Sequence, residues 1–278
     1  MDRVWAGVLQ KMRVAASSPV AYALVDARPG AEGDAQPLNP LIGRRLDLRF
    51  EGVYVCTACG RSPERVYDNG YCEDCVKTRA DADICMMRPE RCHFGDPDNP
   101  CRDESFGLER CFQPHYLYAS LTSDVKVGIT RRANLPTRWI DQGAAAAVTL
   151  ALLPSRKAVG EVEHALAETF KDRTHWMNML RGSPDPAQLD DTVAQIDARL
   201  IELGAPGVLP PEARLRMSFT YPLETRPGRL KTVQLWRTPR IESTLLGIKG
   251  QYLIFEDCVL NVRRHSGFHI ELHAESPP

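Results

Sequence analysis

The stretch HYLYASLTSDVKVGITRR, residues 115–132, decides how the rest of the chain is interpreted. Apolar and polar residues alternate in HYLYAS (115–120) and again in VKVGIT (125–130), as in β-strands, and LTSD between them suits a turn. The stretch therefore predicts a hairpin with Gly128 inside its second strand and two arginines at its end. Because a glycine in a strand lets another group approach the backbone closely, we expect a ligand or the neighbouring helix against Gly128.

A short helix is expected directly after this hairpin. RRANLPTRWIDQG (131–143) offers Asn134 as the N-cap, Pro136 in the first turn and Gly143 at the end. Arg138 falls one turn inside this helix. We expect it to gather with the two arginines of the strand end on one face, as a phosphate site requires.

Two further helices are expected beyond it. KAVGEVEHALAETF (157–170) has an apolar stripe at helical spacing, and Glu163 falls at the edge of that stripe. Its carboxylate either projects into a cleft beside the sheet or is an ordinary glutamate at a helix boundary, and the periodicity leaves both open. SPDPAQLDDTVAQIDARLIELG (183–204) is a second amphipathic helix, with Gly204 as its stop.

The cysteines are concentrated in one part of the chain, since eight of the nine lie between residues 56 and 111. CTACG and CEDC supply two C-x-x-C pairs, each of which turns two thiolates toward one point, as tetrahedral Zn²⁺ requires. Two redox-active dithiols are the alternative, but nothing nearby has the βαβ pattern of a redox fold. We therefore predict a structural zinc site at Cys56, Cys59, Cys72 and Cys75.

A second, looser set of cysteines follows in a segment rich in proline, glycine and acidic residues. Such a segment cannot build a hydrophobic core, which favours a second structural zinc over buried free thiols. His93 or His115 can replace one of the thiolates, and the irregular spacing leaves the exact ligands open. The candidate ligands are Cys85, Cys92, Cys101 and Cys111.

The totals limit the class of protein. The chain has 278 residues, 43% of them hydrophobic, and a formal net charge of −1, which argues against a protein that coats nucleic acid or membrane by charge alone. The N-terminal stretch lacks the apolar region of a signal peptide, and the longest apolar run is too short to span a bilayer. We expect a cytoplasmic protein without membrane contact, and the sequence sets no oligomeric state.

Composition divides the chain into five segments. The first and last are expected to be β-rich and to pair with each other; strands are predicted in VAYALVDA and RRLDLRFEGVYV near the N-terminus, and in LKTVQLW, GQYLIFED, CVLNV and FHIELH near the C-terminus. The segments are a β-rich part (1–55), a cysteine-rich part (56–114), a central core (115–182), a helix with linker (183–209) and a C-terminal β-rich part (210–278).

The central core resembles a known superfamily. A hairpin with Y-L-Y and K-V-G-I-T, then N-L-P-T-R, then a helix carrying E-x-x-L is similar to the GIY-YIG nucleases, especially their phage-type branch with lysine in place of the second tyrosine. The first motif here lacks its glycine. The resemblance implies a small sheet with the two motifs on adjacent strands, an arginine on the first helix and a glutamate on a later one.

Carried over residue by residue, the resemblance implies a catalytic set. Glu163 would hold one divalent cation, Mg²⁺ or Mn²⁺, and Arg138 would neutralise charge on the phosphoryl oxygens. Tyr118, or a water that it orients, would supply the nucleophile or base. Lys126 and Arg132 would position the phosphate backbone of a nucleic acid.

The whole chain also resembles a smaller, uncharacterised bacterial family, in which a GIY-YIG-like core follows a cysteine-rich half. The shared signatures are CMMRPERCHF, KVGIT, RWIDQGA, DRTHW and GIKGQYLI. The predicted fold class is α+β: a GIY-YIG-like small mixed sheet with flanking helices, preceded by a zinc-stabilised cysteine-rich segment, with a β-rich domain built from the N- and C-terminal strands.

Three functions compete on this basis. The first is a metal-dependent phosphodiesterase or nuclease acting on DNA or RNA. The second is a zinc-containing module that binds nucleic acid without cutting it, and its affinity would depend on salt. The third is an enzyme whose arginines bind a phosphorylated or carboxylated small molecule. Fold-level analogy favours the first, although a fold alone does not fix a function.

Overall fold

The computed structural model describes residues 1–31, 35–170, 175–182, 184–224 and 230–276. It is an α+β protein with several small antiparallel sheets, and the chain divides into two compact units. Unit 1 comprises Met1–Thr78 and Thr220–Pro278, and unit 2 comprises Arg79–Phe219. Within the described ranges, no helix is both long enough and apolar enough to cross a membrane.

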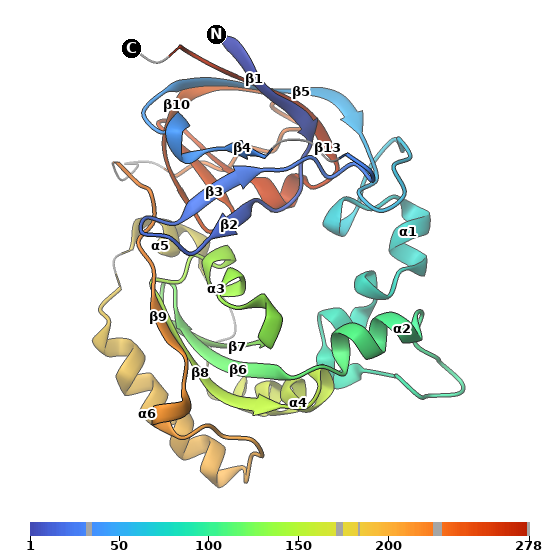
Figure 1. The fold of residues 1–278 in the computed structure, drawn as a ribbon, viewed down its shortest axis with the longest axis vertical. Coiled ribbons are helices and arrows are strands. Elements are labelled where there is room, and N and C mark those ends of the chain that lie inside the picture. The colour runs from blue at the N-terminus through green and yellow to red at the C-terminus, as the bar shows by residue number, and fades with distance from the viewer. Residues whose placement is uncertain (32–34, 171–174, 183, 225–229, 277–278) are drawn as a thin grey trace. The chain divides into compact units, whose positions relative to one another are not determined.

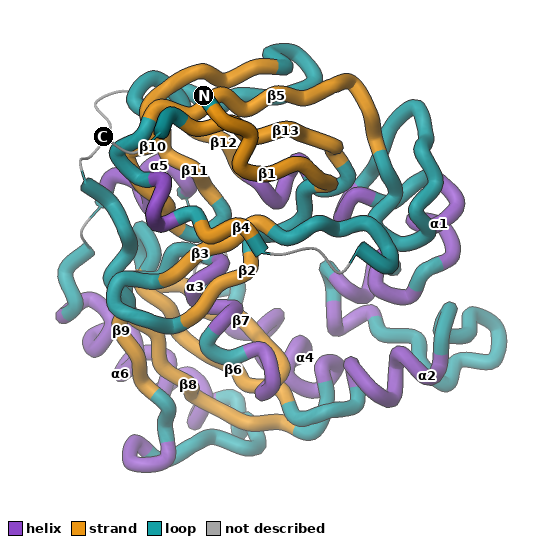
Figure 2. Tube along the Cα trace, turned by 45° about the horizontal axis from the view of Figure 1, so that its top comes forward, coloured by secondary structure: helices purple, strands orange, loops and turns teal. Residues whose placement is uncertain are grey.

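Unit 1 is built on a six-stranded sheet in the order β1-β13-β5-β10-β11-β12, with every neighbouring pair antiparallel. Figure 2 shows β1, β13, β5 and β10 of this sheet. The sheet combines strands from both ends of the chain, so the expected β-rich domain of N- and C-terminal strands is present. The strands are β1 (Asp2–Val8), β5 (Arg45–Tyr54), β10 (Arg240–Lys249), β11 (Tyr252–Phe255), β12 (Val259–Asn261) and β13 (Phe268–Ala274).

Alternation along β5 explains why this strand takes the centre of the sheet. Leu46 and Leu48 are fully buried and Phe50 nearly so, which makes one apolar face. Asp47, on the opposite face, is also buried, and it accepts hydrogen bonds from Arg49 and Arg240. A second sheet in this unit contains β2 (Arg13–Ala15), β3 (Ala21–Leu24) and β4 (Gln36–Pro37), and the helix α1 (Glu73–Thr78) closes the first part of the unit.

Unit 2 is built on a four-stranded sheet in the order β7-β6-β8-β9, antiparallel throughout rather than mixed. Helices cover both faces: α3 lies on one side and α4 and α6 on the other (Figure 1). The strands are β6 (His115–Leu121), β7 (Val125–Arg131), β8 (Ala146–Leu153) and β9 (Arg216–Ser218). The helices are α2 (Glu104–Phe106), α3 (Thr137–Asp141), α4 (Arg156–Leu166), α5 (Trp176–Arg181) and α6 (Ala187–Glu202).

The two faces of this sheet differ in character because successive side chains of a strand point to opposite sides. One face is a hydrophobic core that includes Leu117 of β6, Val127 of β7 and Val159 of α4. The other face carries a smaller cluster in which Tyr118 meets Trp139 of α3 at a ring-centroid distance of 6.0 Å. The buried polar residues Tyr118, Ser120, Lys126 and Thr130 therefore lie on the α3 side of the sheet.

The hairpin predicted at residues 115–132 is confirmed. β6 and β7 pair antiparallel, and Tyr118 lies directly opposite Gly128. A Cβ atom on Gly128 would lie 2.7 Å from the Tyr118 hydroxyl and 2.8 Å from its Cζ atom. The group that approaches Gly128 is thus the tyrosine ring of the adjacent strand, and not the expected ligand or helix.

Several expected boundaries are wrong. Asn134 does not cap α3; it ends a 3₁₀ turn (Arg132–Asn134) and accepts a hydrogen bond from Arg131, while α3 begins after Pro136. The helix expected over 157–170 is capped by the Ser155 hydroxyl and ends at Leu166. LKTVQLW forms a single bridge, Thr232 to Val259, and β10 is the strand that joins the sheet instead.

Candidate metal centres and the tyrosine–arginine site

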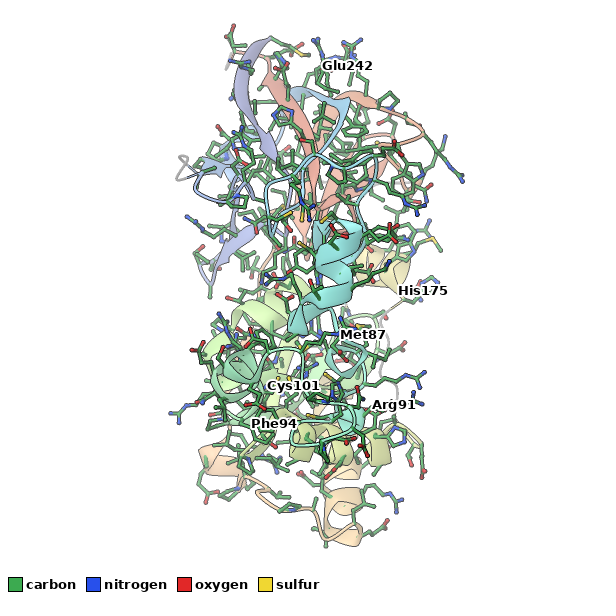
Figure 3. All side chains as sticks on the ribbon, turned by 90° about the vertical axis from the view of Figure 1, so that its right-hand side faces the viewer. Met87, Arg91, Phe94, Cys101, His175 and Glu242 are labelled. Atoms are coloured by element: carbon green, nitrogen blue, oxygen red, sulfur yellow. The ribbon has the colours of Figure 1, made fainter. Side chains whose placement is uncertain are left out.

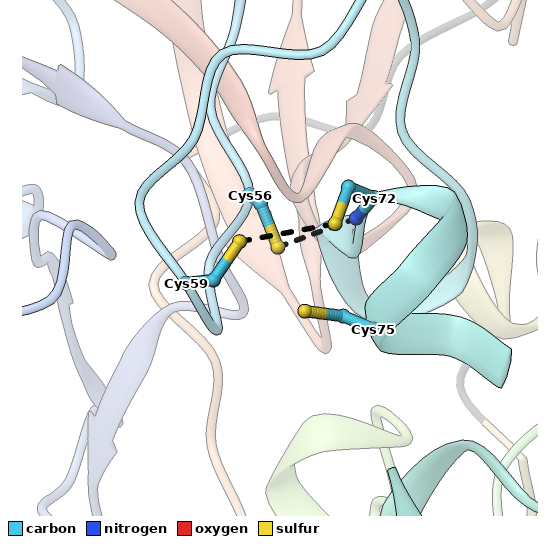
Figure 4. A group of neighbouring side chains, drawn as sticks. All are labelled: Cys56, Cys59, Cys72 and Cys75. Atoms are coloured by element: carbon cyan, nitrogen blue, oxygen red, sulfur yellow. Dashed lines mark hydrogen bonds between the residues drawn. The ribbon is translucent and has the colours of Figure 1, made fainter. Parts of the chain in front are cut away.

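The first cysteine set forms one compact cluster in unit 1, shown in Figure 4. Its donor atoms all lie within 4.8 Å of one another. Cys56 and Cys59 follow β5, while Cys72 immediately precedes α1 and Cys75 lies within it. Gly60 adopts a φ of +73° and donates its N–H to the Cys56 carbonyl, which closes the turn between the first two thiols.

The spacing of these sulfurs fits a single tetrahedral ion. Cys59 Sγ and Cys72 Sγ lie 3.8 Å apart. Two thiolates on tetrahedral Zn²⁺, each bonded at about 2.3 Å, also stand about 3.8 Å apart. The cluster can therefore hold a metal ion such as zinc.

Hydrogen bonds to sulfur already stabilise negative charge in this cluster. The Cys72 backbone N–H donates to Cys56 Sγ at 3.2 Å, and Arg61 Nε donates to Cys59 Sγ at 3.4 Å. The bond from Arg61 lowers the pKa of Cys59 to about 6, whereas burial and then the neighbouring sulfurs raise the pKa of Cys75 to about 12. Four thiols this close do not all ionise unaided, and a bound divalent cation would supply the missing positive charge.

The second cysteine set belongs to unit 2 and surrounds a small cavity. Asp83 and His93 line the same cavity. Phe94 and Cys101, which are labelled in Figure 3, both lie close to Gly107 beside this cavity. Among the described residues of this segment, the donor atoms that lie within 4.8 Å of one another are those of Asp83, Cys85 and His93. The four predicted thiols that line the cavity are Cys85, Cys92, Cys101 and Cys111.

His115, the other histidine considered for this site, lies elsewhere. It begins β6, it is buried, and its Nδ1 donates to the Gln113 carbonyl at 2.6 Å. Burial lowers the pKa of His115 to about 4, which keeps the ring neutral. It does not line the cavity, so His93 is the histidine that the structure brings to the cysteines.

The α3 side of the sheet carries two of the residues that the superfamily resemblance implied, Tyr118 and Arg138, and Glu163 of α4 interacts electrostatically with Arg138. The Tyr118 hydroxyl donates to Gln142 Oε1 at 3.1 Å. The pKa of Arg138 is raised, first by charge interaction and a hydrogen bond with Tyr118, and then by the carboxylates of Asp141 and Glu163. Tyr118 is fully buried, while Arg138 and Glu163 are half-buried. The arginine is therefore within electrostatic reach of a buried hydroxyl and two acidic side chains.

The other two residues from the resemblance lie in different surroundings. Lys126 is buried on the same face of the hairpin as Tyr118, opposite Ser120. Arg132 is exposed and lines a surface groove with Arg131 and Gln113. The arginines expected to gather on one face are thus divided between this groove and the Tyr118 side of the sheet.

Arg156 is a site residue that the sequence interpretation missed. Its Nη2 donates to the Met86 carbonyl at 2.6 Å. Burial lowers the pKa of Arg156, although the charges of Cys111 and Glu163 act to raise it. A spacing signal existed, because Arg156 and Glu163 are seven residues apart and so share one face of α4. Gly160 lies between them, and a Cβ atom there would stand 2.4 Å from Pro89 Cβ. Helix α4 and the cysteine segment are therefore in very close contact.

Fold and site together define an α+β protein with a four-cysteine cluster able to hold a metal ion, and with a buried tyrosine of a β-hairpin beside a half-buried arginine of the following helix. Residues 43–270 match the family model described as a protein of unknown function, DUF2797, and the chain belongs to that family. Comparison with curated proteins and with solved structures gives no match.

Proposed function

We propose that this protein is a GIY-YIG-like, metal-dependent phosphodiesterase or nuclease that acts on DNA or RNA. The observation that carries the proposal is the surroundings of Arg138, whose pKa is raised by the Tyr118 hydroxyl and by the carboxylates of Asp141 and Glu163. An arginine fixed beside a carboxylate is suited to a phosphodiester, because the arginine meets the phosphoryl oxygens and the carboxylate meets a cation.

The acidic groups fit a hard divalent cation. Glu163 and Asp141 both act on Arg138, so carboxylate oxygens of the kind that Mg²⁺ and Mn²⁺ prefer lie near the arginine. When bound at Glu163, such an ion would polarise the scissile phosphate and stabilise the leaving oxygen. Mg²⁺ typically binds through one or two carboxylates plus water and substrate phosphate, which this set can supply.

Each side chain then has a defined task. Arg138 neutralises charge that develops on the phosphoryl oxygens. Tyr118, being fully buried and bonded to Gln142, holds the guanidinium in place more readily than it attacks phosphorus itself. Lys126 adds a positive charge on the same face of the hairpin, and the exposed Arg132 holds the phosphate backbone of the substrate in the adjoining groove.

We also propose that zinc is the metal of the cysteine clusters and that its role is structural. The 3.8 Å separation of Cys59 and Cys72 sulfurs and the all-thiolate ligand set of the first cluster support this identity. A site closed by four protein ligands leaves no position for substrate, so hydrolysis belongs to the Arg138 side of unit 2.

A cleavage assay tests the proposal. Zinc-loaded protein is incubated with plasmid, single-stranded DNA or RNA, in the presence of Mg²⁺ or Mn²⁺. We expect Glu163→Gln and Arg138→Ala to lose cleavage by at least about 100-fold, the effect of removing one transition-state donor. Glu161→Gln, which removes an exposed carboxylate from the same helix, is the matched control and should cleave normally.

Two results separate the alternatives. Folded protein that cleaves nothing with either metal, yet binds nucleic acid with salt-dependent affinity, would replace the nuclease by a binding module. Cleavage that survives in both Glu163→Gln and Arg138→Ala would show a different active site.

A further inference from the structure

The two ring nitrogens of His93 have different partners, and this difference reveals a metal ligand. Nδ1 lies 2.8 Å from the Asn99 carbonyl oxygen. A carbonyl oxygen only accepts, so Nδ1 carries a proton, and Nε2 is the ring nitrogen that remains to bind a metal. Nε2 in turn faces Asp83 Oδ1 at 3.4 Å. A ring nitrogen and a carboxylate oxygen that face each other share either a proton or a metal ion.

The distance favours a metal ion over a proton. A charge-assisted hydrogen bond between an imidazolium and a carboxylate would be about 2.7–2.9 Å long. Nitrogen and oxygen ligands bonded to tetrahedral Zn²⁺ at about 2.0–2.1 Å stand about 3.4 Å apart. The separation of His93 Nε2 and Asp83 Oδ1 matches that of two ligands on one ion.

Cys85 completes a three-ligand set. Its sulfur lies within 4.8 Å of the Asp83 oxygen and the His93 nitrogen. Asp83 accepts the Cys85 backbone N–H at 3.2 Å, which fixes the carboxylate and the thiol relative to each other. The cavity beside them, about 20 Å³, has room for about one water-sized sphere, so it suits a single ion.

The surroundings orient these groups as they do in known metal sites. Ligating histidines generally donate their second nitrogen to a carbonyl or carboxylate, and here Nδ1 of His93 donates to Asn99. Ligating carboxylates are themselves hydrogen-bonded, and Arg102 Nε meets Asp83 Oδ2 at 2.7 Å. Asp83 is almost fully buried, where a carboxylate needs such partners.

We propose that Asp83, Cys85 and His93 bind one zinc ion, and that a single thiol from the same cavity, Cys92 or Cys111, is the fourth ligand. Cys101 takes no part, because its Sγ donates to the Asp103 carbonyl at 3.3 Å. The second metal site is then a mixed oxygen, sulfur and nitrogen site, unlike the all-thiolate first site.

Zinc counting by plasma mass spectrometry tests this ligand set, independently of any nuclease activity. We expect about two zinc ions per chain in the wild type and about one in Asp83→Ala and in His93→Gln, as one of the two proposed sites is lost. Cys101→Ser and Arg102→Gln should keep about two, the latter because it removes a partner of Asp83 and not a ligand. Asp98→Ala, an exposed carboxylate of the same segment, is the matched control.

Asp83→Ala and His93→Gln that both retain about two zinc ions would overturn the proposal. X-ray absorption of the wild type gives a test that needs no variant to fold. The proposed ligands give an average of about three sulfurs per zinc over both sites, whereas an average near four would mean an all-thiolate second site and would refute the role of Asp83 and His93.

Discussion

Substitution of Gly160 by alanine sets two opposing effects against each other. In an exposed helix interior, glycine to alanine stabilises by about 1 kcal/mol. In this helix the new methyl group would stand 2.4 Å from Pro89 Cβ and 3.0 Å from its Cγ, whereas carbon atoms in contact normally stay about 3.5–4.0 Å apart. Pro89 is buried and its ring is rigid, so relief requires movement of the cysteine segment or of α4.

We expect the cost of overpacking to exceed the gain in helix propensity. Overpacking of a buried site costs about 1–3 kcal/mol, and a contact more than 1 Å too short against a rigid ring belongs in the upper part of that range. After subtraction of the helical gain, we expect a net loss of about 1–2 kcal/mol. Displacement of the segment should also lengthen the hydrogen bond from Arg156 to the Met86 carbonyl.

Hydrogen exchange of the α4 amides measures this local free energy of opening. The control is a double-mutant cycle with Pro89→Gly, which removes the ring that the methyl group meets. In that background Gly160→Ala should approach the ordinary gain of about 1 kcal/mol. If Gly160→Ala stabilises α4 by about 1 kcal/mol in the otherwise wild-type chain, the close contact with Pro89 does not exist and the reasoning is refuted.

Three further predictions concern other contacts. Gly128→Ala should destabilise unit 2 by about 1–3 kcal/mol in urea unfolding and lower cleavage activity, because the added methyl group displaces the Tyr118 ring. Unchanged stability and activity would contradict the close packing of Tyr118 on Gly128. Arg61→Ala should weaken zinc binding about 10–100-fold in competition with a chelator, since the thiolates lose their hydrogen bonds, and the exposed Arg65→Ala should not. Hydrogen bonds from Arg240 and Arg49 lower the pKa of Asp47 to about 2, so the carboxylate stabilises the fold above its unfolded pKa of about 4. Asp47→Asn should therefore cost about 1–2 kcal/mol at pH 7, and this difference should shrink as the pH falls from about 4 to 2; a difference that does not change with pH would exclude the mechanism.

Local patterns in the sequence were enough to predict the hairpin and the first cysteine cluster. Alternation with period two and a short polar turn define the pairing of β6 with β7. The geometry of each C-x-x-C pair is set locally, because each pair is a short turn that directs two thiols toward one point. The approach of Tyr118 to Gly128 was not predictable from spacing alone, since it depends on which residues face each other across the pair.

The other features of the fold and the site depend on contacts between segments that are distant in the sequence. LKTVQLW alternates like a strand, yet it forms a single bridge to Val259, and β10 is the strand that pairs with β5. Asp83 looks like one of many acidic residues in a polar segment, and only the folded chain brings it to His93. Arg156 had a helical spacing signal, but its bond to the Met86 carbonyl crosses seventy residues of chain.

The order of strands in unit 1 has a consequence for synthesis of the chain. β5 lies between β13 and β10, and both of these strands follow residue 239. During translation, β5 therefore emerges with both edges unpaired, and it stays so while all of unit 2 is made. Unpaired strand edges attract other chains, so this interval is when the nascent protein is most exposed to aggregation. Early folding of unit 2 cannot shorten this interval, because β10 and β13, the strands that pair with β5, are synthesised after unit 2.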